Sequence, residues 1–139
     1  MGRVLAIDYG RKRSGIAVTD ELRIIASALC TVSSAELITF LKDYISREKV
    51  DVLVVGESLQ MNGQPSQSAE FIEPFVKLLM KTFPAIPVER IDERFTSKMA
   101  SHAIMQAGAK KKDRQDKSLV DRVSATIILQ TYLEKISLL

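Results

Sequence analysis

The chain has 139 residues, which is typical of a single domain, and its 46% hydrophobic and 27% charged residues are ordinary proportions for a globular protein. No stretch approaches the roughly 20 apolar residues that a membrane span needs, and Asp8 interrupts the N-terminal apolar run too early for a signal peptide. The single Cys30 excludes an internal disulfide and a multi-cysteine metal site. We therefore expect one cytoplasmic domain over residues 1–139, with no membrane partner.

The first third of the chain predicts an antiparallel meander. Apolar runs at residues 4–7 and 14–19 are typical of short strands, and the segment between them contains Gly10, a turn former. A third strand is expected over residues 23–32. Short connections join all three, so each strand is predicted to pair with the next along the chain.

After the third predicted strand, the spacing of the apolar residues changes to that of a helix. Ser33 and Glu36 are spaced as a capping box, and apolar residues recur at helical spacing up to about residue 48. Residues 50–55 form a β-branched run of the kind found in strands buried on both faces of a parallel sheet. A second helix is expected up to residue 83, with Pro74 either kinking it or acting as the first residue of a restarted helix.

The last third continues the alternation. Residues 87–91 are predicted to form a strand, residues 97–107 a helix that stops at Gly108, and residues from about 117 onward the final helix. A meander followed by alternating helices and strands predicts an α/β fold: a five-stranded mixed sheet, with an antiparallel meander plus two parallel strands, flanked by helices.

Acidic residues follow three of the predicted strands. The first strand ends at Asp8, the fourth is followed by Glu57, and the fifth by Asp92 and Glu93. Ligands of such sheets usually bind outside the carboxyl ends of the parallel strands, so these carboxylates are predicted to converge on one edge. Each acid has a plainer interpretation, because Asp8 could start a turn and Asp92 and Glu93 could form surface ion pairs with Arg90 or Arg94.

The last helix contributes a further acid. Asp121 shares a helical face with three apolar residues at spacings of four, seven and eleven, namely Ala125, Ile128 and Tyr132. A carboxylate on that face points toward the protein. Clustered carboxylates need a compensating cation, and without paired histidines or cysteines a hard ion is favoured, Mg²⁺ or Mn²⁺ rather than zinc.

Basic residues gather in two segments, although the net charge is only +3. The first is Arg11, Lys12 and Arg13, and the second is a window that includes Lys110, Lys111, Lys112, Arg114 and Lys117. With Arg94, these side chains are candidates for holding the phosphates of a nucleic acid, a contact that positions without specifying sequence. Either cluster alone could equally be a solvated loop.

Residues 8–20, Asp-Tyr-Gly-Arg-Lys-Arg-Ser-Gly-Ile-Ala-Val-Thr-Asp, resemble the opening motif of the YqgF family, also called RuvX-like Holliday junction resolvases. The later motifs of that family are matched in order by residues 54–56 with 61–63, residues 92–97, and residues 117–125 with 128–133. The resemblance is colinear over nearly the whole chain.

The resemblance implies an RNase H-like fold and a metal-dependent endonuclease that processes the 5′ end of pre-16S ribosomal RNA, the older resolvase label having come from fold similarity to RuvC. Catalytic acids carried over would be Asp8, one or both of Asp92 and Glu93, and Asp121, with Asp8, Glu93 and Asp121 as metal ligands. The sequence departs from the family at Glu57, where an apolar residue followed by proline is usual. Glu57 is either an extra ligand or a neutral variation.

Three alternatives stay open. The same chemistry could act on branched DNA, or the chain could bind precursor rRNA or the ribosome as an assembly factor without cutting. The segment from Asp8 to Gly15 also resembles the first phosphate loop of the actin and sugar-kinase superfamily, although those enzymes need two lobes and longer chains. Both a monomer and a homodimer are compatible with the sequence.

Overall fold

The computed structural model describes residues 2–57, 69–92 and 117–137, with the side chains of residues 69, 117–121 and 137 left undescribed. The strands are β1 Arg3–Asp8, β2 Arg13–Thr19, β3 Ala26–Ser33, β4 Val50–Glu57 and β5 Val88–Asp92. The helical elements are η1 Ser34–Glu36, α1 Leu37–Arg47, α2 Ala69–Thr82 and α5 Lys117–Ser137. The predicted helix over residues 97–107 lies outside the described residues.

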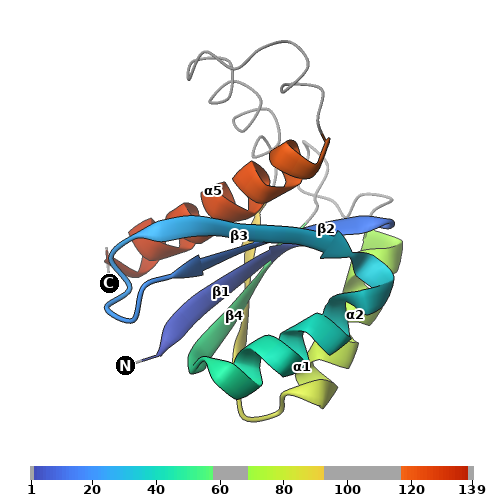
Figure 1. Cartoon of the computed structure of the whole chain (residues 1–139), viewed down its shortest axis with the longest axis horizontal. Helices are drawn as coiled ribbons and strands as arrows, with labels where there is room; N and C mark the ends of the chain where they lie inside the picture. Colours follow the sequence, from blue (N-terminus) through green and yellow to red (C-terminus); the bar gives the residue numbers. More distant parts are fainter. Residues whose placement is uncertain (1, 58–68, 93–116, 138–139) are drawn as a thin grey trace.

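All five strands form one mixed sheet in the order β3-β2-β1-β4-β5 (Figure 1). β1 pairs antiparallel with β2, and β2 antiparallel with β3, so the predicted meander is confirmed. β1 pairs parallel with β4, and β4 parallel with β5, which confirms the two parallel strands. Consequently β1, β4 and β5 all finish at one end of the sheet, which we call the carboxyl edge.

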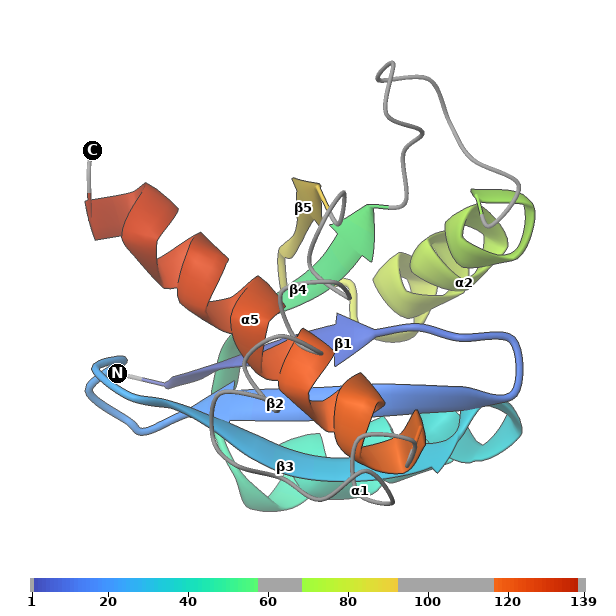
Figure 2. The same cartoon turned by 90° about the horizontal axis from the view of Figure 1, so that it is seen from above.

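Helices cover both faces of the sheet (Figures 1 and 2). On one face, Leu5, Ile7 and Val55 pack against α1 and α2. On the other, Ala6 and Val54 pack against α5. β4 is therefore buried on both sides, as its uninterrupted β-branched run predicts. The alternation of these residues assigns every position of β1 and β4 to the α2 face or the α5 face.

The third strand begins later than the sequence predicts, at Ala26 instead of residue 23. Arg23 adopts the left-handed conformation with φ of 59°, and Asp20 Oδ1 accepts hydrogen bonds from the backbone N–H groups of Ile24 and Ile25, each at 2.8 Å. These bonds keep the segment in a turn, because the carboxylate takes the donors that a strand would need.

One expectation about the helices is wrong, and one of the two alternatives for Pro74 is excluded. Ser33 makes no side-chain capping bond, and the short 3-10 turn η1 precedes α1, so the capping box does not form. α2 runs through Pro74 as one helix, which excludes a restart at that residue. Of the four residues expected on its inner side, Phe75, Val76 and Leu79 are buried as predicted, whereas Met80 is 47% exposed. No helix in the described ranges is long and apolar enough to cross a membrane.

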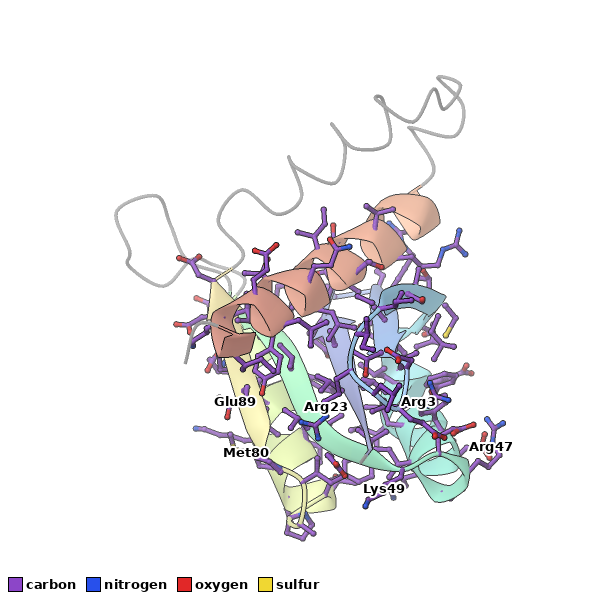
Figure 3. The ribbon with its side chains drawn as sticks, turned by 90° about the vertical axis from the view of Figure 1, so that its left-hand side faces the viewer. Arg3, Arg23, Arg47, Lys49, Met80 and Glu89 are labelled. Atoms are coloured by element: carbon purple, nitrogen blue, oxygen red, sulfur yellow. The ribbon has the colours of Figure 1, made fainter. Side chains whose placement is uncertain are left out.

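Ion pairs close the end of the sheet opposite the carboxyl edge, where β1 begins (Figure 3). Arg23 donates to the Gly2 carbonyl at 3.1 Å and to Asp51 at 2.8 Å, and Arg3 donates to the Thr19 carbonyl at 2.9 Å. Arg3 also pairs with Glu48 at 3.4 Å. These arginines tie β1 to its neighbours, so their charge is committed to the fold.

Candidate active site

Asp8 closes the central strand β1 at the carboxyl edge. It pairs with Gly15 of β2, and the preceding Ile7 pairs with Val55 of β4, so strands flank it on both sides. Four residues before it, Val4 to Ile7, are fully buried. Because Val4 and Ala6 pack on the α5 face, alternation directs the half-buried Asp8 side chain to that face as well.

Glu57 and Asp92 close β4 and β5 at the same edge and lie side by side in register. Val55 of β4 packs on the α2 face, as does Val88 of β5, so alternation directs Glu57 and Asp92 to that face. Asp92 is exposed and Glu57 half-buried. Both therefore point away from the side of the sheet on which Asp8 lies.

The described side chains form no group of acids that could hold a metal ion, which agrees with this division. Within residues 2–57, 70–92 and 122–136, no three His, Cys, Asp or Glu side chains are gathered in that way. Glu93 lies outside the described residues, and Asp121 is described only through its backbone. The predicted meeting of Asp8 with Glu93 and Asp121 therefore stays a prediction.

The backbone of α5 is consistent with that meeting. Ala125 and Ile128 are fully buried against the sheet and Tyr132 is 9% exposed, which confirms that this face of the helix points inward. Figures 1 and 2 show the first turns of α5 (orange) toward the end of the sheet at which β1 finishes. Asp121 belongs to these turns.

The turn after Asp8, residues 9–13, carries the first basic cluster and is held by two serines. The Ser34 hydroxyl donates to the Gly10 carbonyl at 2.5 Å and lies 2.8 Å from the hydroxyl of the fully buried Ser14. The Gly10 N–H donates to Ser14 at 3.4 Å, and the Ser34 N–H donates to the Lys12 carbonyl at 2.9 Å. A Cβ at Gly10 would overlap the Arg13 carbonyl oxygen, so glycine is required there.

Aromatic residues support the same turn from the α2 side. The Tyr9 ring stacks on Phe75, with centroids 4.2 Å apart and an interplanar angle of 9°, and lies 6.1 Å from Phe71. The guanidinium carbon of Arg11 lies 5.0 Å from the centroid of Phe71. Functional roles for Ser14, Ser34 and Phe71 are not predicted from the sequence, because periodicity carries no signal for such contacts.

Arg90 of β5 locks the end of β4 to α2. It donates to the carbonyl oxygens of Val55 and Gly56, at 3.2 and 3.1 Å, and forms two bonds of 2.9 Å with Glu73. The hydrogen bonds from Arg90 hold the pKa of Glu73 below its usual value, against a smaller opposing effect of burial. The predicted phosphate contacts beyond the first basic cluster, Arg94, Lys110, Lys111 and Lys112, lie outside the described residues.

Two solved structures share this architecture along nearly their whole length. The fowlpox virus resolvase, solved with Holliday junction DNA, matches 96% of this chain and 98% of its own with a TM-score of 0.63 at 13% identity. RuvC from T. thermophilus, also solved with a Holliday junction, matches 99% and 97% with a TM-score of 0.62 at 15% identity. The fold is thus RNase H-like, with acids at the carboxyl edge of its sheet.

Sequence comparison narrows the class to one family. Residues 2–135 match the family model described as "RuvX: Holliday junction resolvase", and the chain belongs to this family. A relative from Flavobacterium psychrophilum is 56% identical over 97% of this chain and 98% of its own, and one from Parabacteroides distasonis is 58% identical over 96% of each. Both carry the name "Putative pre-16S rRNA nuclease". Membership places the chain among nucleases, hydrolases of phosphodiester bonds.

Proposed function

We propose that this nuclease cuts precursor ribosomal RNA, in maturation of the 5′ end of pre-16S rRNA, with its active site at the carboxyl edge on the α5 side of β1. The observation that carries the proposal is Asp8, a carboxylate fixed at the end of the central strand beside a rigid basic turn. The substrate class is that named for relatives more than half identical over nearly the whole length. The ribosome is a candidate partner in the cytoplasm.

The residues present fit a hard divalent cation. The acids at the edge offer only oxygen ligands, which Mg²⁺ and Mn²⁺ prefer. In the proposal Asp8, Glu93 and Asp121 hold the ion, and Asp92 stays outside its coordination because it points to the α2 face. When bound, the metal supplies an activated water and stabilises charge on the leaving oxygen. The protein's carboxylates orient the ion, and no side chain serves as the nucleophile.

The basic turn positions the substrate in this proposal. Arg11, Lys12 and Arg13 begin three residues after Asp8, so a phosphodiester at the acid has neighbouring phosphates within their reach. Because the two serines hold the backbone of the turn, little conformational freedom is lost when RNA binds. Binding through phosphates releases counterions and should weaken steeply with salt.

Cleavage of an RNA that spans the 5′ end of 16S rRNA, with Mn²⁺ supplied, tests the proposal. The wild-type protein should cut it, and Asp8→Asn should remove cleavage while leaving folding and RNA binding in place. Asp43→Asn is a matched control, because that exposed acid pairs with Arg47 on α1, away from the carboxyl edge. Equal cleavage by Asp8→Asn and the wild type would refute the proposed site.

Branched DNA is the second candidate substrate, because the family description names Holliday junctions. The same acids would carry out the same hydrolysis, so a four-way junction and the precursor RNA should be compared at equal concentration. Preferential cutting of the junction would select the DNA activity. RNA binding without metal-dependent cutting of either substrate would select a role in assembly alone.

A further inference from the structure

We propose that Phe71 of α2 is a positioning residue: its ring holds the guanidinium of Arg11 where it binds a phosphate next to the one that is cut. The inference rests on the proposed function and adds a specific contact to it. Arg11 and Phe71 are 60 positions apart in sequence, and the guanidinium carbon lies 5.0 Å from the ring centroid. This is within the ~6 Å range of a favourable cation–π contact.

An arginine that contacts an aromatic ring keeps its charge available for a ligand, whereas an arginine paired with a carboxylate does not. Arg3, Arg23, Arg47 and Arg90 each pair with an acid. The Arg11 guanidinium contacts an aromatic face. A ring orients the cation without neutralising it, so Arg11 keeps its full charge for a phosphate.

Both partners of the contact are anchored. Phe71 packs against the core on the α2 face, and its ring lies 6.1 Å from that of Tyr9, which itself stacks on the buried Phe75. The backbone on either side of Arg11 is held by the bonds to Gly10 and Lys12. A long exposed side chain normally loses rotamer freedom on binding, and the ring removes part of that loss beforehand.

The location of the contact defines the path of the substrate. Tyr9, Phe71 and Phe75 lie on the α2 face, whereas Asp8 points to the α5 face. Because the two groups lie on opposite faces of the sheet, we assign Arg11 a phosphate other than the one at Asp8. The nucleic-acid backbone therefore crosses the carboxyl edge from one face to the other. On the α2 side, Phe71 holds Arg11 in position to contact a phosphate.

The inference is tested by measuring how tightly a labelled precursor-rRNA hairpin binds in the absence of divalent metal. Fluorescence anisotropy reports the binding, and the measurement is repeated over a series of salt concentrations. Phe71→Leu should weaken binding about two- to fivefold, the equivalent of one exposed cation–π contact, with an unchanged salt slope because no charge is removed. Arg11→Gln should lower the slope by about 0.9, as expected for one lost phosphate contact. Phe71→Tyr should restore wild-type affinity, because a tyrosine ring also attracts cations.

A double-mutant cycle separates positioning from packing. In the Arg11→Gln background Phe71→Leu should have no further effect on affinity, since the cation is gone. Phe40→Leu is the matched control, because Phe40 is also partly buried and stacks on Tyr44, at 6.2 Å, but lies on α1. It should leave affinity unchanged. An equal loss from Phe71→Leu in both backgrounds would overturn the inference and show a structural role.

The free protein provides an independent readout. Side-chain protons of Arg11 should show an upfield ring-current shift by NMR that disappears in Phe71→Leu and persists in Phe71→Tyr. Absence of that shift in the wild type would overturn the contact itself. Failure of the wild type to bind the hairpin would refute the proposed function, whereas wild-type affinity in Phe71→Leu would refute only this inference.

Discussion

Asp8 and Asp92 end their strands at the same edge of the sheet but point to opposite faces. Asp8 lies two residues after Ala6, which packs against α5, so both point to the α5 face. Asp92 lies in register with Glu57 on the α2 face. β4 separates the two strands. A single ion bound by Asp8 on the α5 side is therefore not expected to use the Asp92 carboxylate.

This relationship predicts different effects for two neighbouring acids. Asp92→Asn should retain most of the Mn²⁺-dependent cleavage rate, whereas Glu93→Gln should reduce it by more than about 100-fold, beyond what loss of a group that merely orients a ligand causes. Rates are measured at saturating Mn²⁺ with precursor RNA, and Mn²⁺ affinity by calorimetry. If Asp92→Asn were as inactive as Asp8→Asn, the assignment of faces to metal binding would be wrong.

The serine pair beneath the basic turn predicts a stability effect. Ser34→Ala should lower the free energy of unfolding by about 1–3 kcal/mol, because the buried Ser14 hydroxyl and the Gly10 carbonyl each lose a partner. Urea denaturation measures the change. Ser46→Ala is the control, since that exposed hydroxyl bonds only the Asp43 carbonyl, and it should cost less than about 0.5 kcal/mol. Equal losses of stability in Ser34→Ala and Ser46→Ala would contradict a stabilising role for the pair of serines.

The bond from Arg90 predicts a pH-dependent contribution to stability. Because the folded pKa of Glu73 lies below its ordinary value of 4.5, the pair stabilises the folded state above about that pH, and the contribution disappears as pH falls through the lowered pKa. Glu73→Gln should thus lower the free energy of unfolding by at most about 1 kcal/mol at pH 7, since Glu73 is half exposed. It should have no effect at a pH low enough to protonate Glu73 in both the folded and the unfolded state. Urea midpoints at several pH values measure this.

Glu70→Gln on the same helix is the control for that series, because Glu70 is exposed and the ion pair of Arg90 is with Glu73. A difference between Glu73→Gln and the wild type that stays constant from neutral to acidic pH would show that lost packing, not the charge pair, causes the effect.

Burial predicts a slow thiol at Cys30. Desolvation raises the pKa of Cys30 above its ordinary value of 9.0, and the positive charge of Arg122 opposes this only in part. The pH midpoint of alkylation by iodoacetamide should therefore lie higher in the folded protein than in the urea-unfolded chain, since the thiolate is the reactive form. Arg122→Gln should raise it further. A folded midpoint at or below the unfolded one would contradict the assignment.

The sheet could be predicted from the sequence because its signals are local. The apolar run before Asp8 and the β-branched run in β4 each specify a strand without reference to the rest of the chain. Chain order and connection rules then place β1 beside both β2 and β4, which brings the acids to one edge. Glu57 and Asp92 at the ends of adjacent strands follow from the same reasoning.

Side-chain direction and long-range contacts could not be predicted in the same way. The face to which Asp92 points depends on the register of β5, and a shift of one residue would reverse it. The contact between Arg11 and Phe71 joins two segments whose spacing in sequence is arbitrary. The delayed start of β3 depends on how the Asp20 carboxylate is oriented, which periodicity does not encode.

The central place of β1 has a consequence for how rigidly the acid is presented. Its amides and carbonyls are bonded to β2 on one side and β4 on the other, and Val4 to Ile7 have no exposed surface. Backbone groups so placed open to solvent only when the whole sheet comes apart, so their amide hydrogens should exchange as slowly as global unfolding permits. Asp8 is thus held at the end of a strand that fluctuates little. Conformational changes that accommodate a substrate are therefore expected in the elements around β1.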